Sequence, residues 1–217
     1  MRRSRQWLVV IALLGAVTAA YADGPGGYRP KDRGPVPVSE QGAIDAYTAG
    51  YASILRAEHA ENLAAAASNE AERKAALDAA QKAYQASLPN FATAVRLDES
   101  MHEAYTYLGY ANRKLGRYDE ALRAYEQALK INPDTPHAIE YQGEAFLGLN
   151  RIDEARFNFL RLYALDQHQA AKLLQAMRAW VQANEANPPA GIDLPALAVW
   201  VAEKSETLKS VPGENLW

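Results

Sequence analysis

One residue pattern occurs twice in this chain, at a spacing of 34 residues. The second copy keeps the central glycine, the alanine and the second aromatic residue of the first copy, but it replaces the leucine and the proline. A repeat of this length forms one supersecondary unit that cannot bury its apolar face alone, so neighbouring units must stack. The pattern positions are Tyr105, Leu108, Gly109, Gly116, Tyr118, Ala121, Tyr125, Ala128 and Pro133, followed by Ile139, Gln142, Gly143, Asn150, Ile152, Ala155, Phe159, Leu162 and Gln167.

The first copy predicts two antiparallel helices. Tyr105, Leu108 and Gly109 recur at helical spacing and share one face, which we expect to be buried. A glycine inside a helix costs about 1 kcal/mol relative to alanine. We therefore expect Gly109 to mark a close crossing with the second helix, where Ala121 and Ala128 offer small side chains.

Short polar segments between the apolar stretches predict where these helices begin and end. Gly116 suits the left-handed conformation at a helix C-terminus. Asp119 and Glu120 favour the start of the next helix because carboxylates stabilise a helix N-terminus. Asn132 and the proline after it end that helix, and residues 134–136 open the third.

This pattern resembles that of the tetratricopeptide repeat (TPR) proteins, most closely over residues 102–167. The resemblance implies an all-α fold, a right-handed stack of antiparallel helix pairs whose first helices line an inner, concave face. It also implies a function, because members of this family mostly bind peptides or partner proteins. Members that bind chaperones carry a Lys, Asn and Arg cluster that grips a terminal carboxylate, and the glutamates on this face contradict that arrangement.

The rest of the chain divides around the two repeats, 102–135 and 136–169. Residues 40–101 predict a long helical hairpin that is a degenerate repeat, with helices at 41–67 and 70–97 and a kink at Pro89. Residues 170–210 predict C-terminal capping helices, the last one capped by Asp193, and 211–217 are a tail without a pattern. We expect Trp200 to pack under the cap, and we expect an apolar stripe of Leu194, Leu197, Val201 and Leu208.

The first 22 residues have the features of a secretory signal peptide: basic residues, an apolar run and an A-x-A site ending at Ala22. Retention as an anchor is the alternative, although the run is shorter than the roughly 20 residues of a comfortable span. Cleavage predicts a periplasmic or secreted protein without a stable membrane span. Residues 23–39, with four prolines and four glycines after Asp23, predict a flexible linker. The cleaved chain has 20 basic and 26 acidic side chains, which argues against a nucleic-acid partner.

The inner face implied by the resemblance supplies the candidate binding residues. Two sets of side chains recur at the same helical spacing, one in each repeat, and we expect them to form a groove in which Tyr110 is the anchor. The carboxylates would face a basic or hydroxyl-bearing partner. The groove residues are Glu103, Thr106, Tyr110, Arg113, His137, Glu140, Glu144 and Leu147.

Catalytic and cofactor motifs do not occur in this sequence, so we predict a protein that is not an enzyme and needs no cofactor. It has no cysteine, no phosphate-binding loop and no nucleophile elbow. The predicted function is an adaptor or assembly factor that binds another envelope protein or peptide. Two alternatives stay open: a metal-handling or enzymatic site near His102 and His137, and a structural component that associates with itself.

Overall fold

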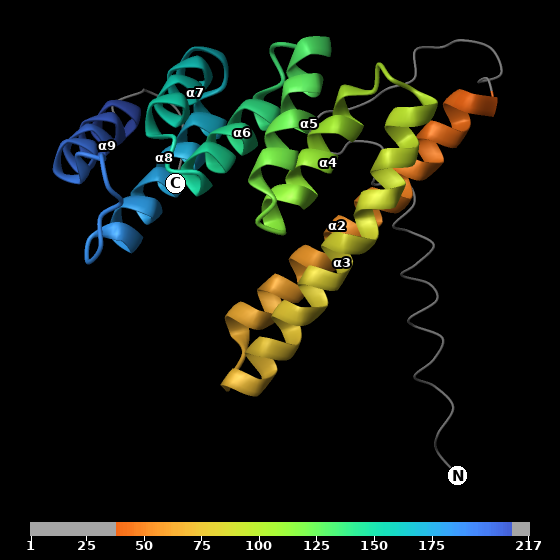
Figure 1. The fold of residues 1–217 in the computed structure, drawn as a ribbon, viewed down its shortest axis with the longest axis horizontal. Helices are drawn as coiled ribbons and strands as arrows, with labels where there is room; N and C mark the ends of the chain where they lie inside the picture. The colour runs from red at the N-terminus through yellow and green to blue at the C-terminus, as the bar shows by residue number, and fades with distance from the viewer. Residues whose placement is uncertain (1–37, 210–217) are drawn as a thin grey trace. The chain divides into compact units, whose positions relative to one another are not determined.

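The computed structural model describes residues 38–209, and within this range every regular element is a helix (Figure 1). The predicted signal peptide, the tail 211–217 and all but the last two residues of the predicted linker lie outside the described residues. The described helices are α2 (Val38–Ala66), α3 (Glu70–Leu97), α4 (His102–Lys114), α5 (Tyr118–Ile131), α6 (Pro136–Gly148), α7 (Ile152–Leu165), α8 (Gln167–Asn184) and α9 (Leu194–Lys209).

Consecutive helices pack as pairs, and the pairs stack. Helices α2 and α3, α4 and α5, α6 and α7, and α8 and α9 contact each other in turn. The first helices of these pairs, α2, α4, α6 and α8, also contact one another in order, and we call them the first-helix row. The prediction of an all-α stack of antiparallel helix pairs is therefore confirmed, and α8 with α9 adds one more pair to it.

Side-chain caps and left-handed turns fix the ends of the helices. The backbone N–H of Glu72 donates to Asn69 at the start of α3, at 3.0 Å, and Asp193 accepts from Ala196 at the start of α9, as predicted. Gly116 has a φ of 73°, which confirms the left-handed turn between α4 and α5. Asn150 takes the equivalent turn in the second repeat with a φ of 59°, a conformation that asparagine tolerates better than most residues.

Several helical glycines mark close crossings, and two of them occupy the same position in successive repeats. A Cβ atom on Gly109 would lie 2.5 Å from the Cε1 atom of Tyr125, so α4 and α5 pack against each other across a bare glycine surface. The close approach is confirmed, and its nearest neighbour is this ring of α5. The same position in the next repeat is Gly143, where a Cβ atom would lie 2.6 Å from Leu173 of α8.

The apolar core runs through the stack and includes most of the predicted residues. Phe159, Leu162 and Leu173 have no exposed surface. Trp200 packs its ring against Phe159 at 5.2 Å between centroids, as expected. Leu108 is only half-buried, because it lies at the margin of the cluster around α2 and α4, so its predicted place in the core is corrected. The predicted stripe of α9 is buried at Leu194, Leu197, Val201 and Leu208.

Candidate functional site

A continuous stripe of tyrosine rings crosses the first-helix row from α2 to α6. Tyr51 of α2 lies 5.1 Å from Tyr107 of α4 between ring centroids, and the rings of Tyr107 and Tyr110 lie 6.2 Å apart. Tyr110 in turn lies 4.8 Å from Tyr141 of α6. Tyr47 stacks on Tyr51 at 6.2 Å. We call these five residues the tyrosine stripe.

The helical spacing of the sequence produces this stripe. Tyr47 and Tyr51 are one turn apart on α2, so their rings project from the same face. Tyr107 and Tyr141 are 34 residues apart and occupy the same position in two successive repeats. Tyr47, Tyr51 and Tyr141 keep part of their surface in solvent, whereas Tyr107 and Tyr110 are each 8% exposed. These three partly buried rings therefore rest on a buried aromatic layer.

Tyr110 belongs to that buried layer and is not the exposed anchor that the sequence predicted. Its hydroxyl donates to the carboxylate of Glu58 on α2 at 2.9 Å, and its ring meets Tyr84 of α3 edge-on at 6.0 Å. Burial, together with nearby Tyr84 and Glu58, raises its pKa above the ordinary range, so the hydroxyl stays protonated. The physical reason for the correction is the long hairpin, whose helices cover this ring.

Arg113 and Glu144 meet between α4 and α6. Their side chains form an ion pair in which Arg113 is 14% and Glu144 is 24% exposed. The guanidinium also lies over the rings of Tyr110 and Tyr141, at 5.2 and 5.4 Å from their centroids. Cation–π contact and the ion pair hold the arginine in place. These two groove residues, predicted in successive repeats, therefore neutralise each other.

Glu140 lies one turn before Glu144 and is almost fully buried, at 3% exposure. Burial of its carboxyl group, the neighbouring charge of Glu144 and a hydrogen bond to that residue raise the pKa of Glu140 well above its ordinary value. The carboxylate of Glu144 beside it also pairs with Arg113. This carboxyl group is therefore part of the packing between helices and does not face a partner.

The remaining predicted groove residues separate into buried and half-exposed members. Thr106 and Leu147 are buried at 3% and 4% exposure, and the threonine hydroxyl donates to the carbonyl of His102 at 2.9 Å, which corrects their placement in the groove. Glu103 and His137 are half-buried. Burial, followed by the charge of Lys172, lowers the pKa of His137, so this imidazole is neutral near pH 7.

Carboxylates border the tyrosine stripe, several of them from residues that sequence reasoning missed. Glu58 and Glu61 reach it from α2, and Glu61 pairs with Lys114 of α4 at 2.7 Å. Glu103 lies close enough to Tyr47 for its charge to raise the tyrosine pKa, after burial as the main cause. Glu144 is a fourth carboxylate near the stripe, and the cations near these groups include Arg113, Lys114 and Lys172. The recurrence of tyrosine at 107 and 141 was the sequence signal that could have revealed the surface.

Histidines do not gather into a metal site in the described part of the chain. His102 contacts Asn132 at 3.2 Å and Glu103 at 3.3 Å. No three His, Cys, Asp or Glu side chains among residues 38–209 are grouped so that they could hold a metal ion. Helices α2 to α9 also include no segment long and apolar enough to cross a bilayer.

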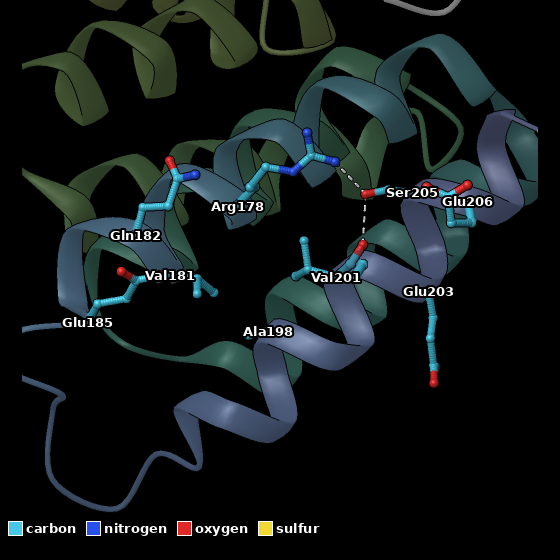
Figure 2. Close-up of a pocket in the computed structure, with 10 residues that line it drawn as sticks. Arg178, Val181, Gln182, Glu185, Ala198, Val201, Glu203, Ser205 and Glu206 are labelled. Atoms are coloured by element: carbon cyan, nitrogen blue, oxygen red, sulfur yellow. Dashed lines mark hydrogen bonds between the residues drawn. The ribbon is translucent and has the colours of Figure 1, made fainter.

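A hollow of about 630 Å³ lies between α8 and α9, in the last described pair of the stack (Figure 2). Arg178 reaches across it and donates to the hydroxyl of Ser205 at 2.6 Å. That hydroxyl donates in turn to the carbonyl of Val201 at 2.7 Å. With its proton committed to a backbone carbonyl, Ser205 has the setting of a structural residue and not of a nucleophile.

Comparison with known proteins agrees with this architecture. Residues 102–135 match the tetratricopeptide repeat family. The chain is also 30% identical over 114 residues to heat shock protein STI1 of Saccharomyces cerevisiae, a match that covers 51% of this chain and 19% of the yeast protein. Tetratricopeptide repeats are typically scaffolds for protein–protein interaction without enzymatic activity. Residues 102–135 are therefore a tetratricopeptide repeat, within a stack of helix pairs that resembles this family.

Proposed function

We propose that this protein is an adaptor or assembly factor that binds a partner protein or peptide of the cell envelope through the tyrosine stripe. The proposal places the protein in the periplasm or outside the cell, because residues 1–22 have the composition of a signal peptide. The family supports the general class of function, protein–protein interaction. The envelope location and the adaptor role are inferences from the sequence.

The observation that carries the proposal is the partly buried aromatic surface on the first-helix row. Tyr47, Tyr51 and Tyr141 offer rigid rings with polar tips, and such residues give large contact areas at a low entropic cost. Glu58 and Glu103 add negative charge beside the rings. An extended peptide with basic side chains would meet rings and carboxylates together, and a carboxylate-bearing peptide end would meet repulsion.

The test is partner capture with two matched double variants of the full chain. Tyr51→Ala with Glu103→Arg alters the tyrosine stripe and its border. Phe157→Ala with Glu126→Arg likewise removes one aromatic ring and reverses one charge, on α7 and α5, where Phe157 is 61% exposed. Circular dichroism and thermal unfolding first establish that both variants keep the helical fold. Envelope proteins that bind the wild type are then identified by mass spectrometry.

The proposal predicts that the stripe variant loses the partner, while the variant of α5 and α7 retains it. A partner lost only from the α5 and α7 variant would move the binding surface to the second helices of the pairs. A folded wild-type chain that captures no envelope protein would argue against the adaptor function itself.

A further inference from the structure

We propose that two copies of this chain associate through an apolar patch on α7 and α9, the second helices of the last two described pairs. The patch consists of Phe157 and Leu160 of α7 and Val199 of α9, and we call it the second-helix patch. The inference goes beyond the proposed function, because none of these residues lies on the helices that carry the tyrosine stripe. Four observations carry it: exposure, a comparison of the two repeats, a neighbouring hollow and the surrounding charges.

The patch leaves large apolar side chains in solvent. Phe157 and Val199 are 61% and 59% exposed, more than any other large apolar side chain among residues 38–209, and Leu160 is 52% exposed. Helix α7 packs into the stack through its opposite face, where Phe159 and Leu162 are fully buried. Three such side chains expose on the order of 300 Å² of apolar surface, a size of patch that often marks a contact with another protein.

The first repeat shows that this face of a second helix does not require apolar residues. The residues 34 positions before Phe157 and Leu160 are Arg123 and Glu126 of α5, and both are exposed. The same two positions therefore carry charges in one repeat and large apolar side chains in the next. Packing within the stack does not explain the difference, because all four side chains face solvent. A surface that another protein covers does explain it.

The patch lies beside a second hollow, which has a volume of about 560 Å³. Helices α7 and α9 lie side by side at the C-terminal end of the stack, where the Trp200 ring contacts Phe159 (Figure 1). Val199 and Trp200 of α9 and Arg156 of α7 contribute to the lining of the hollow. Phe157 follows Arg156 directly in the chain, so a projecting ring and a hollow occur on one surface.

A projection beside a hollow suits a second copy of the same surface. In a two-fold interface, residue i of one copy contacts residue j of the other, and the reverse contact occurs as well. Phe157 of each copy would enter the hollow of the other, which has room for a side chain of this size. The interface closes on itself after two copies, because the projection and the hollow belong to the same face.

The charges around the patch agree with this occupant. Two local ion pairs lie at its border, Arg151 with Glu154 at 2.8 Å and Arg156 with Asp153 at 3.5 Å. Such exposed pairs contribute little to stability, so their members can exchange partners at little cost. A border with both signs can pair opposite charges across a two-fold axis, whereas a strongly acidic or basic partner would meet repulsion from one set.

The size of the patch suits a dimer that forms and dissociates with concentration. Standard interfaces bury roughly 800 Å² per partner. The three apolar side chains supply less than half of this area, and the charged border would supply the rest. Because the patch lies on second helices and the tyrosine stripe lies on α2, α4 and α6, the dimer would present two stripes.

Sedimentation velocity of the full chain over a range of concentrations tests the proposal. Phe157→Glu places a charge at the centre of the patch. Leu63→Glu is the matched control, because it places the same charge on another exposed apolar side chain, 53% exposed near the end of α2. Both positions face solvent, and circular dichroism establishes that both variants keep the helical fold.

The average mass of the wild type should rise with concentration toward twice the monomer mass. Phe157→Glu should need a roughly tenfold or higher concentration to reach the same mass, and Leu63→Glu should behave like the wild type. A mass that stays monomeric at every concentration would overturn the proposal. Association that is equal in Phe157→Glu and the wild type would overturn it as well, because the contact would then lie elsewhere.

Crosslinking through single cysteines locates the contact, since the chain has no cysteine of its own. Asp153→Cys places a thiol at the border of the patch, on a side chain that is 93% exposed. Glu126→Cys places it on the exposed face of α5. A short crosslinker that joins two thiols should form covalent dimers several-fold faster with Asp153→Cys, and adding Phe157→Glu should remove the excess. Equal rates would contradict a contact at α7 and α9.

The result is independent of the proposed function. The stripe variant, Tyr51→Ala with Glu103→Arg, should dimerise like the wild type, because neither residue lies on α7 or α9. Dimerisation without any captured envelope protein would keep this inference and reject the adaptor function. A monomeric chain whose captured partner is lost with Phe157→Glu would reject the inference, because the patch would then bind a different protein.

Discussion

Gly109 shows how one absent methyl group sets the distance between two helices. The neighbouring ring belongs to Tyr125, which has no exposed surface and cannot swing aside. Gly109→Ala should destabilise the protein by about 1 to 3 kcal/mol through overpacking, although alanine is the better helix former by about 1 kcal/mol. Urea unfolding measures the change. Gly42→Ala is the control, because its Cβ atom would lie 3.3 Å from the end of the flexible Leu97 side chain. Equal effects at both positions would contradict the close crossing.

Glu140 should give the protein a pH dependence that a glutamine lacks. Its folded-state pKa is raised by burial and by Glu144, so the folded chain holds a proton that the unfolded chain releases. The contribution of this group to stability is complete below its unfolded pKa and falls as pH rises toward its folded pKa. The slope in that window is at most about 1.4 kcal/mol per pH unit for one proton.

Glu140→Gln keeps a neutral side chain at every pH and should remove this dependence. The stability of the variant relative to the wild type should therefore increase as pH rises from about 4.5. Urea unfolding at several pH values measures it, with Glu126→Gln as a control for the loss of a surface carboxylate. A stability difference between Glu140→Gln and the wild type that stays constant across this range would show that Glu140 is ionised in the folded protein.

At the scale of the helices, buried side chains stabilise one end of the long hairpin of α2 and α3, and local polar contacts stabilise the other end. The half of α3 near α4 buries Tyr84, Phe91 and Ala94, whereas residues 70–79 bury none of their side chains. At the far end, where α2 and α3 join, Leu63 and Leu77 are 53% and 43% exposed (Figure 1). The cap from Asn69 and local ion pairs such as Arg73 with Glu70 hold that end together.

Hydrogen exchange should reveal this difference in stability between the two ends of α3. Amides of residues 70–79 should exchange through local opening, well before the amides around Phe91 and Ile54, because little buried apolar surface opposes their opening. Asn69→Ala should speed exchange in the first turns of α3 further and cost about 1 kcal/mol of helix stability. Uniform protection along α3, measured by mass spectrometry, would contradict this view of the hairpin.

The ends of the helices could be read from sequence because they depend on local chemistry. Asn69, Gly116 and Asp193 act within a few residues of their own positions, and the helices begin and end within three residues of the predicted ranges 41–67 and 70–97. The burial of Tyr110 depends instead on Glu58, 52 residues earlier, in a hairpin whose packing partner the repeat pattern does not specify. The groove residues were predicted on the helices that became α4 and α6, but Tyr110, Thr106, Glu140 and Leu147 were assigned to solvent when they lie inside.

At the scale of the whole molecule, stability depends on the interfaces between successive pairs. Each pair contacts its neighbours along the chain, so a cavity at one interface weakens the coupling through the stack. Leu173 of α8 is fully buried against α6, and Leu173→Ala should cost about 2 to 5 kcal/mol. Leu108→Ala should cost clearly less, because Leu108 is only half-buried. Thermal and urea unfolding give both values, and equal costs would contradict the assignment of the interface.

A double-mutant cycle then tests whether Gly143 and Leu173 form the contact between α6 and α8. Gly143→Ala alone should destabilise the chain, because the new Cβ atom would lie 2.6 Å from a methyl group of Leu173. In the Leu173→Ala background that methyl group is gone, and the added Cβ atom enters the space it leaves. The double variant should therefore be more stable than the sum of the single changes predicts, with a coupling of about 0.5 to 3 kcal/mol. Strict additivity would mean that the two helices do not meet at these residues, and the stacking of the last pair on the second repeat would need another contact to hold it.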